Sequence, residues 1–111
     1  MSPAPRLPQR TAVLLAVLAL AAGARAADGP ALFGDNCASC HGMDGHARTP
    51  AGKKVHAKDL TLSQLTDPEI EHQIREGKKD AQGRVAMPPF KDQLTADEIK
   101  ALIPVVKAFR R

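Results

Sequence analysis

The pattern of apolar and polar residues predicts a helix at each end of the region from residue 27 to residue 111. Near its start, Asp28-Gly29-Pro30 supplies a cap and a first-turn proline for a short helix that leads into Cys37. Near its end, from position 96 onward, apolar residues recur at helical spacing: Ile99, Leu102, Ile103, Val106 and Phe109. Pro104 lies inside this second pattern, so we expect it to kink or split the helix.

Two segments carry the same helix-start signal. In Leu65-Thr66-Asp67-Pro68-Glu69-Ile70 and in Leu94-Thr95-Ala96-Asp97-Glu98-Ile99, Thr precedes Glu by three positions, with Leu before the Thr and Ile after the Glu. This is the pattern of a capping box with a hydrophobic staple, and it predicts a helix start at each segment. The first of these helices should run to about Glu76 and end at Gly77, which tolerates left-handed backbone. No stretch alternates like a strand, which favours an all-α fold.

The first 26 residues read as an export signal. Arg6 and Arg10 are followed by an uncharged apolar run of 12 residues, and Ala24-Arg25-Ala26 offers the small residues that a signal peptidase accepts. The run is shorter than the ~20 residues that span a bilayer, and a retained membrane anchor is the alternative. We therefore predict that residues 1–26 are a cleaved Sec signal peptide and that residues 27–111 form one periplasmic domain.

Removing this segment changes the charge and the size of the chain. The full-length net charge of +4 falls to +1, with 13 basic and 12 acidic residues among the remaining 85. Without a dominant basic stretch and without Tyr or Trp for stacking, the composition argues against nucleic-acid binding. A domain of this size with only Phe33, Phe90 and Phe109 as aromatics can bury little apolar surface unaided. A flat apolar cofactor would supply the missing core, so we expect the cofactor-free chain to be largely unfolded.

Candidate chemistry is concentrated in Cys37-Ala38-Ser39-Cys40-His41. Two cysteines with two residues between them and a histidine directly after form the attachment signature of a c-type haem: the thiols add to the porphyrin vinyl groups and the imidazole binds the iron. A lone disulfide here would close a very small loop and add little stability. A thioredoxin-like dithiol would need a βαβ pattern, and a zinc site would need a second ligand pair, neither of which the sequence contains.

The stretch after His41 is rich in turn-forming residues at positions 42–45 and 49–54 and lacks helical periodicity, which predicts an irregular loop beside the haem. A ligating histidine normally donates its other ring N–H to a carbonyl or a carboxylate. Pro50 is our candidate for that carbonyl, because its ring fixes the local backbone and it has no competing N–H.

Met87 is our candidate for the second axial ligand of the iron, facing His41. Met87-Pro88-Pro89 is a stiff, extended segment that can hold a thioether at one position without a helix. Met43 and His46 are too near His41 in sequence to reach the opposite face of the ring. His56 and His72 remain alternative ligands, although lone histidines are more often surface or core residues.

Taken together, these motifs resemble those of the small bacterial class I c-type cytochromes. The resemblance rests on five segments in order: Leu32-Phe33, Cys37 to Gly42, Ala57 to Leu60, Met87 to Asp92, and Leu94 to Leu102. It implies the class I cytochrome c fold, with three main helices and connecting loops around one covalent haem and with the terminal helices crossing. It also implies His41 and Met87 as iron ligands. Val105 stands where the family often has an aromatic residue, and with Pro104 it puts the helix crossing in question.

Ligation by His and Met leaves no open position on the iron, so we expect a one-electron carrier and not an enzyme. Its donor and acceptor would be redox proteins that bind weakly at the haem edge, steered by Lys53, Lys54, Lys91 and Lys100. We expect a monomer without a membrane span after signal cleavage. The alternatives are a dedicated cytochrome subunit of a periplasmic dehydrogenase or oxidase complex, and a haem-based gas sensor or enzyme, which would need the sixth position vacant.

Overall fold

The computed structural model describes residues 2–5 and 26–111, so the expected signal peptide lies almost entirely outside the described residues. The described part is mostly helical, as predicted. Its elements in chain order are α2 (Gly29–Asn36), α3 (Ala38–His41), α4 (Pro50–Lys54), the one-turn 3-10 helix η1 (Leu60–Leu62), α5 (Asp67–Glu76), β1 (Lys78–Lys79), β2 (Val85–Met87) and α6 (Ala96–Ala108). Within these ranges no helix is long and apolar enough to cross a membrane.

The predicted starts of α2, α5 and α6 and the predicted end of α5 occur in the structure. The Asp28 carboxylate accepts the Ala31 N–H at 3.1 Å and caps α2. Capping boxes open both α5 and α6, formed by Thr66 with Glu69 and by Thr95 with Glu98. α5 ends at Gly77, whose φ of 68° is the positive value that glycine adopts readily.

α6 continues through Pro104 as one helix, so the expectation that this proline splits it is wrong. A proline inside a helix removes the hydrogen bond to the carbonyl four residues earlier, here that of Lys100. Both residues are exposed. The carbonyl that loses its partner therefore lies on the solvent side of the helix, where water can bind it, and the apolar face is left intact.

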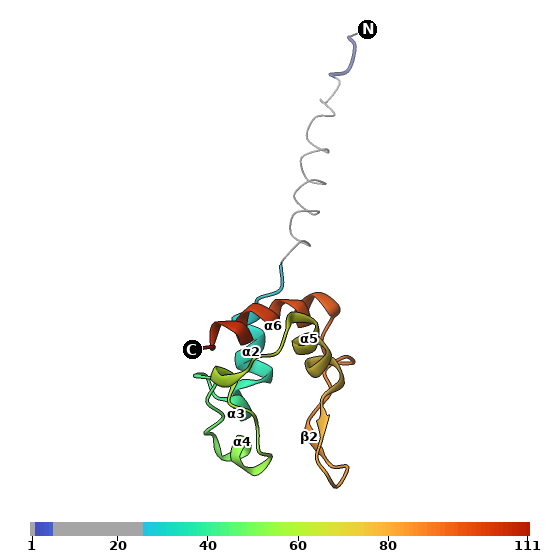
Figure 1. The fold of residues 1–111 in the computed structure, drawn as a ribbon. Coiled ribbons are helices and arrows are strands. Elements are labelled where there is room, and N and C mark those ends of the chain that lie inside the picture. The colour runs from blue at the N-terminus through green and yellow to red at the C-terminus, as the bar shows by residue number, and fades with distance from the viewer. Residues whose placement is uncertain (1, 6–25) are drawn as a thin grey trace.

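The core lies where α2, α5 and α6 meet. Its buried members are Phe33, Ile70, Ile74, Phe90, Ile99, Leu102 and Val106. α6 runs across α2 in Figure 1. A side chain at Gly29 would overlap the Ala101 carbonyl oxygen and lie 2.9 Å from Val105 Cγ2, so the absence of a Cβ allows the two backbones to meet. The small Val105 therefore fits this contact. Further along, the rings of Phe33 and Phe109 pack at 5.0 Å between centroids.

Two arms extend from the helix layer in Figure 1, one containing α3 and α4 and the other β2. We call residues 37–62 the histidine arm and residues 77–91 the methionine arm. α4 corrects the expectation of an irregular loop at residues 49–54: the Thr49 hydroxyl accepts the Gly52 N–H at 2.9 Å and caps a short helix. In the methionine arm, β1 pairs antiparallel with β2, Lys78 opposite Met87. Strands of 2 and 3 residues are too short to give an alternating pattern, which is why the sequence did not reveal them.

Candidate functional site

Cys37, Cys40 and His41 lie within one helical turn, because α3 begins directly after Cys37. The Cys37 carbonyl accepts the backbone N–H groups of Cys40 at 3.2 Å and of His41 at 2.9 Å. Both cysteines are free and half-buried. Residues three apart on a helical turn share a face, so the two thiols are placed to reach the same edge of one planar group.

The Cys37 thiol borders the apolar core. Burial, and next the neighbouring Cys40, raise the pKa of the Cys37 thiol from 9.0 to about 11. A thiol with this pKa stays protonated at neutral pH, whereas metal-binding and nucleophilic cysteines act as thiolates. The apolar environment of Cys37 is therefore compatible with a neutral thioether.

His41 is oriented by the backbone of a distant loop. Its Nδ1 lies 2.9 Å from the Lys58 carbonyl oxygen. A carbonyl can only accept, so Nδ1 carries the proton and the Nε2 lone pair remains free to bind a metal. The prediction that Pro50 supplies this carbonyl is wrong. Pro50 begins α4, so its carbonyl points along that helix, and nothing in the sequence marks Lys58 for the role.

The loop that carries Lys58 is fastened to the rest of the histidine arm. Asp59 accepts hydrogen bonds from the Thr61 hydroxyl at 2.6 Å and the Thr61 N–H at 2.9 Å, and its other oxygen lies 3.2 Å from His46 Nδ1. The Leu60 N–H donates to the Gly45 carbonyl at 2.8 Å. The Thr61 hydroxyl, and with it His46, holds the pKa of the Asp59 carboxyl below its ordinary value. His46 thus pairs with Asp59 within the histidine arm.

Met87 lies at the end of β2, half-buried, and packs against the same core cluster as Cys37. The segment that follows it is attached to the C-terminal end of α5: the Phe90 N–H donates to the Ile74 carbonyl at 3.0 Å, and the Lys91 N–H to the Arg75 carbonyl at 3.3 Å. The last carbonyls of a helix have no partner within it, and these two bonds satisfy them. The structure therefore anchors the methionine arm on a helix end.

The side-chain chemistry of the four predicted residues fits a haem. The described residues contain no group of three or more His, Cys, Asp and Glu side chains that could hold a metal ion by themselves. They do offer two thiols in one turn, an imidazole with a free Nε2, and a thioether on the other arm. These side chains are too few to hold an iron ion alone, so a porphyrin would have to supply its remaining ligands. The core beside Cys37 and Met87 is apolar, which suits a porphyrin.

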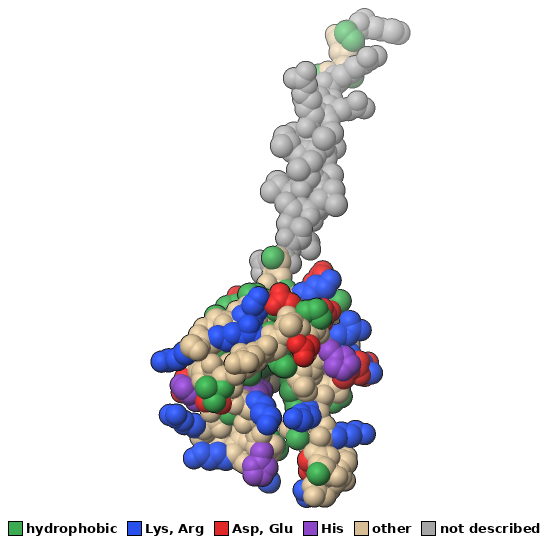
Figure 2. All heavy atoms as spheres, viewed as in Figure 1, with side chains coloured by type: hydrophobic (Ala, Val, Ile, Leu, Met, Phe, Trp, Pro, Cys, Tyr) green, Lys and Arg blue, Asp and Glu red, His purple; other side chains and the backbone are tan. Residues whose placement is uncertain are grey.

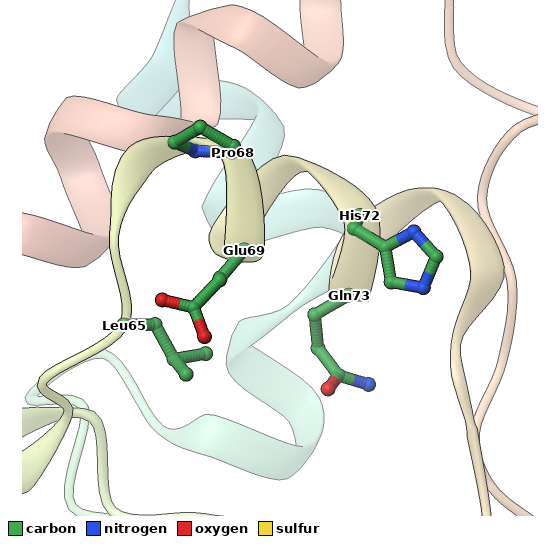
Figure 3. A pocket seen from close by; sticks show the side chains of 5 residues that line it. All are labelled: Leu65, Pro68, Glu69, His72 and Gln73. Atoms are coloured by element: carbon green, nitrogen blue, oxygen red, sulfur yellow. The ribbon is translucent and has the colours of Figure 1, made fainter.

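A surface hollow of 290 Å³ lies along α5, and none of these four residues lines it. Leu65, Pro68, Glu69, His72 and Gln73 line it. In Figure 3, Leu65, Glu69 and Gln73 extend to one side of the helix, whereas the His72 ring extends away from them. His72 and the other alternative ligand, His56, are both exposed, and His56 has a positive φ of 55° in a turn.

Charged side chains are mixed over the face shown in Figure 2, with Lys and Arg on both arms and on the helix layer. The candidate steering residues Lys53, Lys54, Lys91 and Lys100 are all exposed. Lys91 Nζ also forms an ion pair with Glu76 at 3.2 Å. The described surface therefore shows the near balance of charges expected from the sequence.

Comparison with known proteins shows the family. A family model described as cytochrome C oxidase, cbb3-type, subunit III matches residues 24–104. Cytochrome c-551 of Stutzerimonas stutzeri is 35% identical over 96 residues, which cover 81% of this chain and 89% of that protein.

Solved structures agree with the sequence comparison. The c-type cytochrome KustC0563 superimposes with a TM-score of 0.65 at 36% identity, covering 76% of this chain and 99% of that chain. A chain of the Kuenenia stuttgartiensis reducing HAO-like protein complex Kustc0457/Kustc0458 has a TM-score of 0.63 at 24% identity, over 74% of this chain and 41% of that chain; it supports the fold alone. The chain therefore belongs to the small bacterial class I c-type cytochromes, electron-transfer proteins that carry haem c and its iron in covalent linkage.

Proposed function

We propose that this chain is a periplasmic one-electron carrier in which Cys37 and Cys40 bind the haem as thioethers and His41 and Met87 are the axial ligands. The observation that carries the proposal is the hydrogen bond from His41 Nδ1 to the Lys58 carbonyl at 2.9 Å, since it leaves Nε2 free for the iron. The placement of the half-buried Met87 on the other arm supports it. A haem iron with both axial positions filled changes by one electron with little movement and offers no site for a substrate.

The residues of this chain then have distinct roles. Cys37 and Cys40 would hold the haem as thioethers, since addition of a thiol across a vinyl group places sulfur on one carbon and hydrogen on the other and needs no oxidant. Lys58 fixes the imidazole ring and its tautomer through the carbonyl. The apolar cluster shared by Cys37 and Met87 excludes water from one side of the site, and a dry site with a thioether ligand favours a higher reduction potential.

The ligand assignment is tested by the ferric absorption spectrum of Met87→Ala beside wild type. We expect the weak long-wavelength band of sulfur-to-iron ligation in wild type and its loss in Met87→Ala. Met43→Ala is the matched control, because Met43 follows His41 closely but is 72% exposed, and it should keep the band. A band that persists in Met87→Ala would overturn Met87 as the ligand. Prompt carbon monoxide binding by reduced wild type would favour the sensor or enzyme alternative.

A second candidate function is a dedicated subunit of a larger redox complex. It is favoured by the description of the matched family model as an oxidase subunit. Against it, the match covers 89% of cytochrome c-551 and 99% of KustC0563, both named as cytochromes, but only 41% of the chain from the complex. Purification from the native periplasm decides: a monomer of one haem supports the carrier, whereas stable co-purification with an oxidase or dehydrogenase supports the subunit.

Export rests on residues 1–26, and the mass of the mature protein tests it. A polypeptide that begins at Ala27 and carries one added haem would confirm cleavage of the predicted signal. A haem-bearing chain that still begins at Met1 and stays with the membrane would instead support the anchor.

A further inference from the structure

The side-chain amide of Gln73 lies between the end of α5 and the Met87 sulfur. Its Nε2 is 2.9 Å from the Gly77 carbonyl oxygen and 3.9 Å from Met87 Sδ. A primary amide nitrogen has two N–H groups, so it can donate to both acceptors at once. Sulfur is a large, weak acceptor, and its hydrogen bonds are correspondingly longer than those to oxygen. Gln73 is half-buried, so water competes only partly for these bonds.

The orientation of the amide is determined by its partners. The opposite assignment would place Gln73 Oε1 against the Gly77 carbonyl, two acceptors facing each other without a proton between them. The nitrogen must therefore face Gly77, and the same nitrogen is the Gln73 atom within reach of the sulfur. The hydrogen bond to Gly77, and not Met87 itself, therefore determines that an N–H group of Gln73 faces the sulfur.

The distance between the amide and the sulfur is fixed by backbone packing. A Cβ at Gly77 would overlap the Met87 carbonyl oxygen and lie 2.7 Å from Pro89 N, so the turn after α5 lies directly against the Met87 segment. The Phe90 N–H bond to Ile74 holds the same segment from the other side. Neither the helix nor the methionine arm can shift without breaking these contacts, so the arrangement is preorganised.

We propose that Gln73 is a positioning residue for Met87: it donates a hydrogen bond to the thioether sulfur, fixes which sulfur lone pair faces the iron, and raises the reduction potential. The inference rests on the proposed function, in which Met87 is the ligand. A hydrogen bond to the sulfur withdraws electron density from it, which weakens its donation to iron(III) more than to iron(II) and so favours the reduced form. A neighbouring group that tunes a ligand in this way acts without touching the metal.

Gln73→Leu tests the proposal, because leucine suits the helix and has no donor. We expect the potential to fall as the redox equilibrium shifts by up to about tenfold, which is about 59 mV for a one-electron couple. The long-wavelength sulfur band should shift while the haem stays attached. Gln73→Met is the second variant, since it keeps the length and flexibility of the side chain and again lacks a donor; it should show the same fall.

Gln93→Leu is the matched control, since Gln93 is an exposed glutamine in the turn after Phe90, and its described bond is made by its backbone N–H. Its potential should equal that of wild type. A wild-type potential and band in folded Gln73→Leu or Gln73→Met would overturn the inference, even if thermal stability fell, and would leave Met87 as the ligand. Persistence of the band in Met87→Ala would instead remove the proposed ligation itself, so the two failures are distinguishable.

Discussion

The histidine arm and the methionine arm hold their candidate ligands by different means. In the histidine arm, His41 lies on a helical turn directly after Cys40, and the loop that orients it is fastened by side chains of the same arm, Asp59, Thr61 and His46. In the methionine arm, Met87 lies on a two-stranded hairpin whose position depends on bonds to α5. The loop that orients His41 is thus fastened within its own arm, whereas the segment after Met87 is attached to a separate helix.

This difference indicates which ligand is lost more readily. In the proposed assignment, thioether bonds from Cys37 and Cys40 would keep the adjacent His41 near the iron even when the surrounding loop loosens. Met87 has no covalent link to the haem, and its position is lost whenever the end of α5 separates from residues 87–91. We therefore expect local opening of this molecule to begin in the methionine arm.

The largest expected effect comes from removing the haem, which both arms share. In Cys37→Ala/Cys40→Ala the cofactor cannot attach, and the remaining core of seven clustered apolar residues is small for a domain of this length. We expect no cooperative thermal transition by circular dichroism and rapid proteolysis of both arms. A cooperative transition in the haem-free variant would show that the helix layer folds without the cofactor, and the comparison would then concern the arms alone.

A smaller effect should distinguish the two arms. Gly77→Ala adds a Cβ that overlaps the backbone beside Met87 at a φ of 68°, and we expect it to destabilise the protein by about 3 kcal/mol. Gly83→Ala is the matched control on the same hairpin, since its φ of 79° is similar but its Cβ would meet nothing within 4 Å. It should cost about 1 kcal/mol. The measurements are chemical denaturation and carbon monoxide binding to the reduced protein.

Carbon monoxide should bind faster in Gly77→Ala than in wild type, because the contact that holds Met87 is displaced, and should be unchanged in Gly83→Ala. Equal rates in both variants would show that the helix end does not control Met87, and the contrast between the arms would lose its basis.

The smallest effect is on acid stability. The pKa of Asp59 is held below its ordinary value of 3.8, first by the Thr61 hydroxyl. A carboxyl whose pKa is lower in the folded than in the unfolded state stabilises the fold above 3.8 and loses that contribution as the pH falls through its folded pKa. Below pH 3.8 the thermal midpoint of wild type should therefore fall more steeply than that of Asp59→Asn.

Asp80→Asn is the counterpart on the methionine arm, because the Arg84 N–H likewise lowers the pKa of Asp80. Both variants should flatten the acid limb of the stability curve, but only Asp80→Asn should speed carbon monoxide binding. Faster binding in Asp59→Asn would contradict the view that the histidine arm is secured independently.

The sequence predicted best what depends on neighbouring residues. The caps at Asp28, Thr66 and Thr95 and the end at Gly77 follow from short patterns, and all of them occur in the structure. The motif from Cys37 to His41 likewise predicted haem c because its chemistry lies within five residues. Its assignment of individual ligands, with Met87, stays a prediction.

What the sequence did not predict depends on contacts across the chain. The Lys58 carbonyl orients His41 from 17 positions away, and a backbone oxygen has no sequence signature. Gln73 could be predicted to reach the helix end four residues later, but not the sulfur of Met87. The prediction that Pro104 splits α6 was wrong because the free-energy cost of the lost backbone hydrogen bond depends on whether that helix face is exposed. Exposure follows from tertiary packing.

The contact of Gly29 with Ala101 joins the first helix of the domain to the last. The amino-terminal helix α2 therefore lacks its contact with α6 until the carboxyl-terminal segment has been made, and a chain that emerges in order completes its core late. If the chain is exported as proposed, it still lacks this helix contact for as long as its carboxyl-terminal segment remains in the export channel.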